Sequence, residues 1–190
     1  MKLRICAVTG LIFLVINQFM LLQGVEFIQT QSPIDYAHWL LFIGVLLCLS
    51  INQIFSDNLF SNTATILTTI GVIALGGQAV IDFCWWSYGT DYDGMKNLDY
   101  LIMSNPSLRI PFMTIGPAFF YIGLVLHSLK FFKEQTIWTL ITVTGVIVIG
   151  VSSLVIFDRM IISIGHIILT IGMSGLILLI SNDDRTGINN

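Results

Sequence analysis

The sequence predicts an all-α integral membrane protein, a polytopic bundle of six transmembrane helices that forms a single domain over residues 1–190. Hydrophobic residues make up 55% of the chain and charged residues only 10%, whereas a soluble domain carries charge on about a quarter of its residues. The mean hydropathy of +0.88 points the same way. Lipid is therefore expected to cover much of the surface.

Six apolar segments are long enough to cross a membrane, which takes about 20 residues for a typical hydrocarbon core. They cover residues 5–22, 36–55, 63–83, 110–131, 137–157 and 160–180. They lack the strict alternation of barrel strands, and a backbone in lipid must satisfy its own hydrogen bonds, so we expect each to be a helix. The first segment also has the basic start of a secretory signal. No cleavage site follows it, which favours an uncleaved helix.

The orientation follows from the basic residues, because short cytoplasmic loops retain Lys and Arg. With the N-terminus inside, the inner set is Lys2, Arg4, Lys130, Lys133 and Arg185, and the outer set is Lys96, Arg109 and Arg159. The sequence thus predicts that both termini are cytoplasmic and that the long loop 84–109 faces outward. The aromatic residues of this loop, Trp85, Trp86, Tyr88 and Tyr92, are typical of an interfacial belt, although long loops also carry function.

Several classes of site are not indicated. The basic residues are scattered, which excludes the phosphate-tracking stripe of a nucleic-acid binder. Cys6, Cys48 and Cys84 form no disulfide framework, and the three histidines lie on three different spans, so neither a metal site nor a cofactor is expected. His127, beside Lys130 at the inner end of the fourth span, is expected to anchor that end at the interface. Because no known catalytic motif occurs, an enzyme is not the favoured class.

Polar side chains within the spans are the best indication of a site, because they are costly in hydrocarbon and usually face a bundle interior. Gln78 and Asp82 lie four residues apart, on one helix face. His166 lies about six residues into the last span, roughly 9 Å deep at 1.5 Å per residue. We expect an outward-facing pocket bounded by Asn17 or Gln18, Gln78, Asp82 and His166, with Glu26, His38 and Arg109 near its mouth.

Two interpretations of this set remain open. If Asp82 and His166 lie close together in the pocket, they could exchange protons in the physiological range. In the other interpretation, Asp82 reaches the lipid headgroups and His166 bonds to a backbone carbonyl within the core.

Small residues predict close helix contacts. The spacing of seven between Gly116 and Gly123, and between Gly165 and Gly172, places each pair on nearly one face, as at membrane helix contacts. A repeat of three helix hairpins is an alternative origin for the likeness between these two spans. Pro117 directly follows Gly116 inside the fourth span, where it frees a backbone carbonyl and predicts a kink or hinge.

The function predicted from these features is that of a small transporter or ligand-binding membrane protein with an outward-facing polar pocket. The alternatives are a membrane sensor or accessory subunit that acts through helix contacts, and a lipid-directed intramembrane enzyme. The expected partners are the lipid bilayer, a small-molecule ligand, and a second copy or another membrane protein. The expected location is a bacterial plasma (inner) membrane, since no organelle-targeting feature is present.

Overall fold

The chain is helical in the computed structural model, which describes residues 1–55 and 59–179, and no strand occurs among these residues. Six helices are long and apolar enough to cross a membrane, which indicates a membrane protein. These six candidate spans, called spans below, are α1 (Lys2–Leu21); α3 (Tyr36–Cys48) with α4 (Ser50–Ile54); α5 (Leu59–Trp86); α7 (Pro106–Leu108), η1 (Arg109–Thr114) and α8 (Ile115–Leu129); α9 (Thr136–Val151) with η2 (Ser152–Ile156); and α10 (Arg159–Leu179). Here η1 and η2 are π-helical turns.

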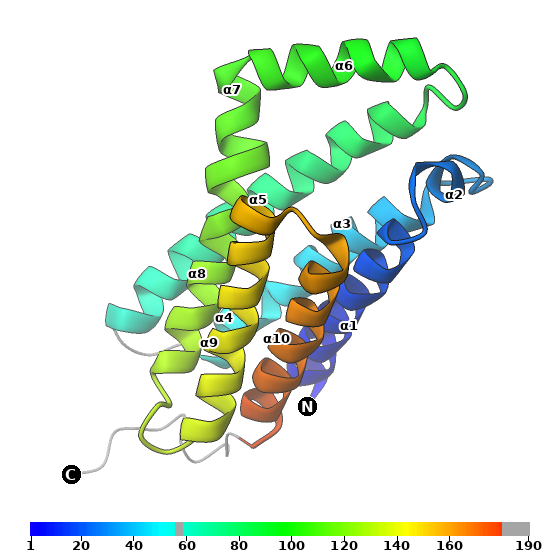
Figure 1. The fold of residues 1–190 in the computed structure, drawn as a ribbon. Helices are drawn as coiled ribbons and strands as arrows, with labels where there is room; N and C mark the ends of the chain where they lie inside the picture. The colour runs from blue at the N-terminus through cyan, green and yellow to red at the C-terminus, as the bar shows by residue number, and fades with distance from the viewer. Residues whose placement is uncertain (56–58, 180–190) are drawn as a thin grey trace.

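The connection predicted as the loop 84–109 differs from that expectation. The third span continues to Trp86, and residues Tyr92–Ser104 form the amphipathic helix α6, which lies across one end of the bundle (Figure 1). Asp91 starts α6 by accepting a hydrogen bond from the Gly94 amide at 2.9 Å, which satisfies a free amide of the first turn. A further short helix, α2 (Val25–Gln29), lies in the connection between α1 and α3. Residue 180, at the end of the sixth predicted span, and Arg185 lie outside the described residues.

The six spans close into a ring. Each packs against the next along the chain, from α1 to α3, α5, α8, α9 and α10, and α10 returns to pack against α1 (Figure 1). The most extensive contacts join α1 with α3, α5 with α8, and α9 with α10. Three antiparallel hairpins therefore stand side by side around one axis.

Glycines permit the close approach within these hairpins. A methyl group built on Gly123 would lie 2.3 Å from the Thr68 hydroxyl of α5, and one on Gly172 would lie 2.5 Å from the Thr142 amide of α9. Gly116 and Gly165 meet the same two partner helices. Both predicted glycine pairs thus lie at a helix contact, where van der Waals packing replaces the hydrophobic drive that is missing in lipid.

The start of α1 and the end of α10 lie at the same end of the ring, where the Arg4 guanidinium donates to the Leu178 carbonyl at 3.5 Å. We call this the termini end, and the opposite end the α6 end (Figure 1). The core is filled toward the termini end by side chains with almost no exposed surface: Leu11, Ile51, Phe55, Leu124, Met173, Leu176 and Ile177.

His127 belongs to this packed region, so the prediction that it anchors the helix at the interface is wrong. Its side chain is fully buried, and its Nε2 lies 3.0 Å from Oδ1 of Asn52. Its ring lies 5.5 Å from the ring of Phe55, centroid to centroid. The side chains around this position bury the imidazole completely, so it is hydrogen-bonded in the core through Nε2 and does not reach the interface.

Candidate functional site

A cavity of about 350 Å³ lies inside the ring toward the α6 end, and we call it the central cavity. All six spans contribute to its wall. Its polar and charged lining residues are Asn17, Gln18, His38, Gln78, Asp82, Thr114, Tyr121, Ser153, Arg159 and His166. A cavity of this size, enclosed by several elements and mostly apolar with a few polar groups, is typical of a small-molecule site.

The structure brings together all five residues of the pocket expected from the sequence. Asn17, Gln18, Gln78, Asp82 and His166 line the central cavity. Of the three residues expected near its mouth, His38 lines it, whereas Glu26 and Arg109 are exposed and line neither this cavity nor the one next to it.

The histidine of α10 is held by two hydrogen bonds. His166 Nδ1 lies 2.9 Å from the Ile162 carbonyl, and Nε2 lies 2.9 Å from the hydroxyl of Tyr121. Because a carbonyl oxygen only accepts, Nδ1 carries the proton and donates to it, and Nε2 accepts from the tyrosine. His166 therefore bonds to Tyr121 and to its own helix, and not to Asp82.

The three amide side chains have different roles. Asn17 is fully buried and donates to the Ala37 carbonyl at 2.9 Å, which ties α1 to the first turn of α3. Gln18 donates to the Asn17 side-chain oxygen at 3.0 Å. Gln78 makes no side-chain hydrogen bond with any residue that the structure describes, so its amide is available to a solute.

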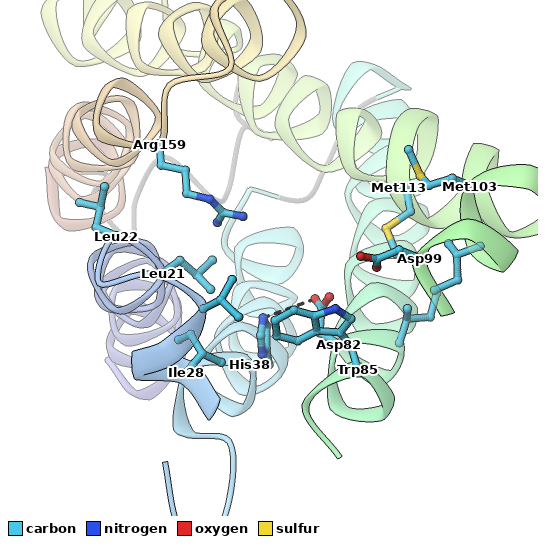
Figure 2. Close-up of a pocket in the computed structure, with 14 residues that line it drawn as sticks. Leu21, Leu22, Ile28, His38, Asp82, Trp85, Asp99, Met103, Met113 and Arg159 are labelled. Atoms are coloured by element: carbon cyan, nitrogen blue, oxygen red, sulfur yellow. Dashed lines mark ion pairs between the residues drawn. The ribbon is translucent and has the colours of Figure 1, made fainter. Parts of the chain in front are cut away.

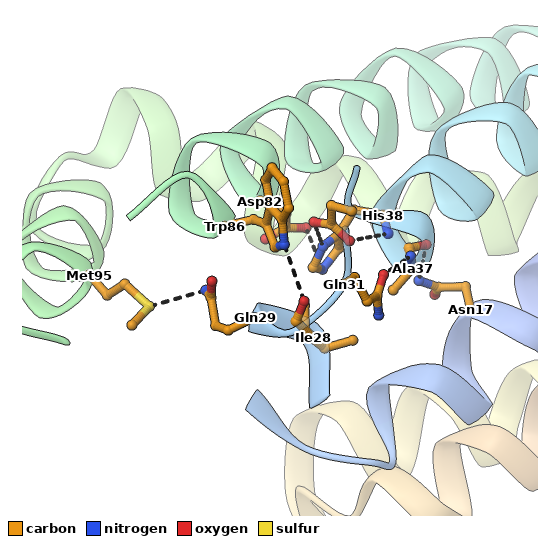
Figure 3. A network of polar contacts seen from close by, with 10 residues as sticks. Asn17, Ile28, Gln29, Gln31, Ala37, His38, Asp82, Trp86 and Met95 are labelled. Atoms are coloured by element: carbon orange, nitrogen blue, oxygen red, sulfur yellow. Dashed lines mark hydrogen bonds and ion pairs between the residues drawn. The ribbon is translucent and has the colours of Figure 1, made fainter. Parts of the chain in front are cut away.

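Three ionisable side chains, Asp35, His38 and Asp82, form a chain of contacts between α3 and α5, and Figure 3 shows the last two of them. Asp35 caps α3: one of its oxygens accepts from the His38 amide at 3.1 Å, and the other lies 2.5 Å from His38 Nδ1. On the opposite side of the imidazole, Nε2 lies 3.7 Å from Oδ2 of Asp82. The buried Asp35 thus fixes the ring so that Nε2 is directed at Asp82, which is a quarter exposed at 24%.

Sequence reasoning did not assign a role to Asp35, because the residue lies outside the apolar segment. The sequence nevertheless contains an indication of this role. An Asp that directly precedes a helix can cap it, and an Asp three residues before a His can also contact that His.

A second cavity of about 440 Å³ adjoins the first on the α6 side, and we call it the vestibule (Figure 2). The two cavities share the lining residues Leu21, His38, Asp82, Met113 and Arg159. The vestibule is completed by apolar side chains from α1, α2 and α6, together with Trp85 and Asp99. Arg159, which the sequence analysis used only as an outer basic residue, therefore lines both cavities.

The connection between α1 and α3 is fixed on the same side by contacts with distant residues (Figure 3). The Trp86 indole donates to the Ile28 carbonyl at 3.1 Å, and the Gln31 side chain accepts from the Ala37 amide at 3.1 Å. The Gln29 side-chain amide donates to the Trp86 carbonyl at 3.0 Å and to the Gly89 carbonyl at 3.3 Å. These bonds order the rim next to Asp35 and His38.

Both π-helical turns lie against the central cavity. Met113 and Thr114 of η1, and Ser153 and Leu154 of η2, are among its lining residues. Pro117, expected to kink the fourth span, lines the cavity just after η1, and it has no amide to donate to the carbonyl four residues earlier. Irregular backbone at membrane depth is tolerated where it borders protein or a cavity, and π-turns recur at functional sites.

No three His, Cys, Asp or Glu side chains within the described ranges are gathered closely enough to hold a metal ion. The chain matches no protein-family model, no curated protein and no solved structure.

Proposed function

We propose that the protein is a small transporter or ligand-binding membrane protein, whose ligand enters the central cavity from the α6 end. The observation that carries this proposal is the shape of the ring: six spans surround one cavity with several polar groups in its wall, and the packed core closes it toward the termini end. Such a cavity admits a solute from one side only. Transport would need a second conformation, and the irregular turns η1 and η2 are the segments of the wall with the least regular hydrogen bonding.

In this proposal all six helices cross a bacterial inner membrane, both termini are cytoplasmic, and the α6 end faces outward. The packing of Arg4 against the end of α10 supports an even number of crossings. The basic residues Lys2, Arg4, Lys130 and Lys133 lie at the termini end, as expected for cytoplasmic loops. The amphipathic α6 suits a position at the membrane–water interface.

Cysteine labelling tests the access and the orientation together. In a background with Cys6→Ser, Cys48→Ala and Cys84→Ser, a single Gln78→Cys should react with an impermeant maleimide applied to intact cells. Leu124→Cys, in the packed core, should stay unlabelled. Labelling of Gln78→Cys only in inverted vesicles would reverse the orientation, and no labelling from either side would refute the open cavity.

Occupancy of the cavity is tested with a bulky substitution. Gln78→Trp should fill the central cavity and abolish any thermal stabilisation that solutes give to the wild type. Ile147→Trp on α9 is the matched control, because Ile147 is 57% exposed and lines neither cavity. Equal responses of both variants to a stabilising solute would place its binding elsewhere.

The second candidate function is a lipid-directed enzyme, which the Asp35–His38–Asp82 chain favours. A histidine oriented by a buried carboxylate is suited to act as a general base on water or a hydroxyl. In that case Asp35→Asn would lower turnover of a lipid substrate while leaving the binding of lipid unchanged.

A further inference from the structure

Charges of opposite sign line the vestibule without pairing with each other. Arg159 at the start of α10 extends into it from one wall, and Asp82 of α5 and Asp99 of α6 border it elsewhere (Figure 2). No ion pair joins Arg159 to either carboxylate in the described part of the chain, and the guanidinium has no side-chain hydrogen bond there either. The vestibule thus offers a cation and two carboxylates at separate positions.

The position of Arg159 is fixed by the turn before α10. Phe157 adopts a left-handed conformation with φ of 59° and ends η2, and Asp158 then caps α10 by accepting from the amides of Met160 at 2.7 Å and Ile161 at 3.1 Å. Both bonds are to Oδ1, and among the described residues no ion pair joins the Asp158 carboxylate to the Arg159 guanidinium. Arg159 keeps its five donors for another acceptor.

Asp82 is also only partly engaged. Its one ion-pair contact among the described residues is the 3.7 Å approach to His38, whose other nitrogen is bonded to Asp35. A carboxylate accepts about four hydrogen bonds, so most of its capacity faces the cavity. Asp99 is exposed and approaches the vestibule from α6.

Apart from His38, the remaining wall of the vestibule is apolar and includes an aromatic ring. It consists of Leu21, Leu22, Val25, Ile28, Ile81, Trp85, Ile102, Met103 and Met113. Arg159 and Asp99 are exposed, whereas the Asp82 side chain is only 24% exposed, so the Asp82 charge interacts with a ligand more strongly than it would in water. A ligand that carries both signs and an apolar part would satisfy the whole lining at once.

We propose that the vestibule binds a zwitterion with an apolar substituent, whose anionic group pairs with Arg159 and whose ammonium group pairs with Asp82 and Asp99. This inference rests on the proposed ligand-binding function and names its substrate class. Arg is suited to a planar or tetrahedral oxyanion, because its donors form a fixed fork. The ammonium group would lie near Trp85, whose ring face also attracts cations.

Two sources supply this chemistry: a free α-amino acid, and the headgroup of a zwitterionic lipid such as phosphatidylethanolamine. Both combine an anion, an ammonium group and an apolar part. They are distinguished by whether stabilisation follows the added solute or the lipid composition of the bilayer.

The test uses the full chain in nanodiscs of phosphatidylglycerol. Thermal stability is measured with L-leucine, with isopentylamine, which lacks the carboxylate, and with isohexanoate, which lacks the amine. The same measurement without solute is repeated in nanodiscs that also contain phosphatidylethanolamine. The variants are Arg159→Gln and Asp82→Asn, with Arg109→Gln and Asp93→Asn as controls of equal charge change that line neither cavity. Each variant must first elute as a single species without ligand.

For a free amino acid, leucine should stabilise the wild type and both controls, and each fragment should bind at least about tenfold more weakly, since a charge-assisted contact is lost. Asp82→Asn should weaken leucine binding by a similar factor. Arg159→Gln should bind leucine no better than it binds isopentylamine. For a lipid headgroup, phosphatidylethanolamine should raise the melting temperature of the wild type and the controls, but not of the two vestibule variants.

Two results would overturn the inference. If isopentylamine binds as well as leucine and Arg159→Gln has no effect, the ligand is a simple cation, and the proposed ligand-binding function survives without the zwitterion. If neither leucine nor phosphatidylethanolamine stabilises the wild type more than the vestibule variants, no zwitterion is bound. Labelling of Gln78→Cys then decides whether the open cavity, and with it the proposed function, also fails.

Discussion

The two ends of the ring contain similar residues but use them differently. At the termini end, His127, Asn52 and Phe55 pack together, and the histidine has no exposed surface. At the α6 end, His166 and Asp82 border open space. Both ends contain a histidine and neighbouring polar groups, so polarity does not distinguish them. The difference is whether large apolar side chains fill the space between the helices.

Hydrogen bonding at the termini end is mostly internal. The Thr139 hydroxyl donates to the Ser128 carbonyl at 3.0 Å, and the Ser128 hydroxyl donates to the Val125 carbonyl at 2.7 Å. These polar groups need no solvent. At the α6 end, Gln78 and Arg159 lack such partners among the described residues. His127 Nδ1 and the Ser174 hydroxyl are also buried without a hydrogen-bond partner among the described residues, so unpaired polar groups indicate the site only where they border unfilled space.

The largest expected effect is the loss of a large side chain from the packed end. Phe55→Ala should reduce the free energy of unfolding by about 3–5 kcal/mol, because the ring of Phe55 is fully buried against His127 and Phe131 and a void would remain. Met113→Ala, at the cavity wall, should cost markedly less, since part of its surface already faces open space. Reversible denaturation in mixed micelles measures both, and equal losses would contradict the difference between the two ends.

The histidines provide the next comparison. His127→Leu should cost about 1–3 kcal/mol, because the oxygen of Asn52 loses its buried partner. His166→Leu should cost less, since water in the central cavity can replace the bond to the Tyr121 hydroxyl. The same denaturation experiment measures both variants. A larger loss for His166→Leu would show that the central cavity is dry.

Two glycines provide a matched pair of substitutions that test the close packing of the helices. A methyl group on Gly71 would lie 2.2 Å from the backbone nitrogen of Phe120, so Gly71→Ala must separate α5 from α8 and should cost about 1–3 kcal/mol. Gly150 has no atom within 4 Å of such a methyl group, and Gly150→Ala should be neutral or stabilising by up to about 1 kcal/mol. Comparable destabilisation of the two variants in mixed micelles would refute the close contact.

Much of the fold could be predicted from hydropathy, because the cost of polar backbone in lipid makes every long apolar segment a helix. The closure of the ring could not be predicted, because the contact between α1 and α10 depends on the shapes of the two helix surfaces, and no sequence motif indicates it. Helix α6 was missed because its apolar residues, such as Met95 and Ile102, are seven apart within a polar stretch. A spacing of seven is typical of one helix face, but the polar composition of the stretch predicts a loop.

Part of the candidate site could be predicted from where residues lie along each helix. The spacing of Gln78 and Asp82 on one face, and the depth of His166, follow from helix geometry. Arg159 and Asp35 were not assigned to the site because they lie at helix ends, where charged residues usually face solvent. Only the three-dimensional arrangement shows that Arg159 lines both cavities and that Asp35 orients His38.

The smallest expected effect on stability concerns Pro117, where the two regions meet. Pro117→Ala restores a backbone amide for the carbonyl of Met113, so the free energy of unfolding should change by less than about 1 kcal/mol, since the gained hydrogen bond is worth about that much. The gain should nevertheless favour a regular helix over the π-turn η1 and shift Met113 and Thr114, which line the central cavity. The rate at which Gln78→Cys is labelled should therefore change, while Asp93→Cys, at an exposed position of α6 that lines neither cavity, keeps its rate as a control. An unchanged rate for Gln78→Cys would mean that η1 is held by its neighbours on α5 and not by the proline.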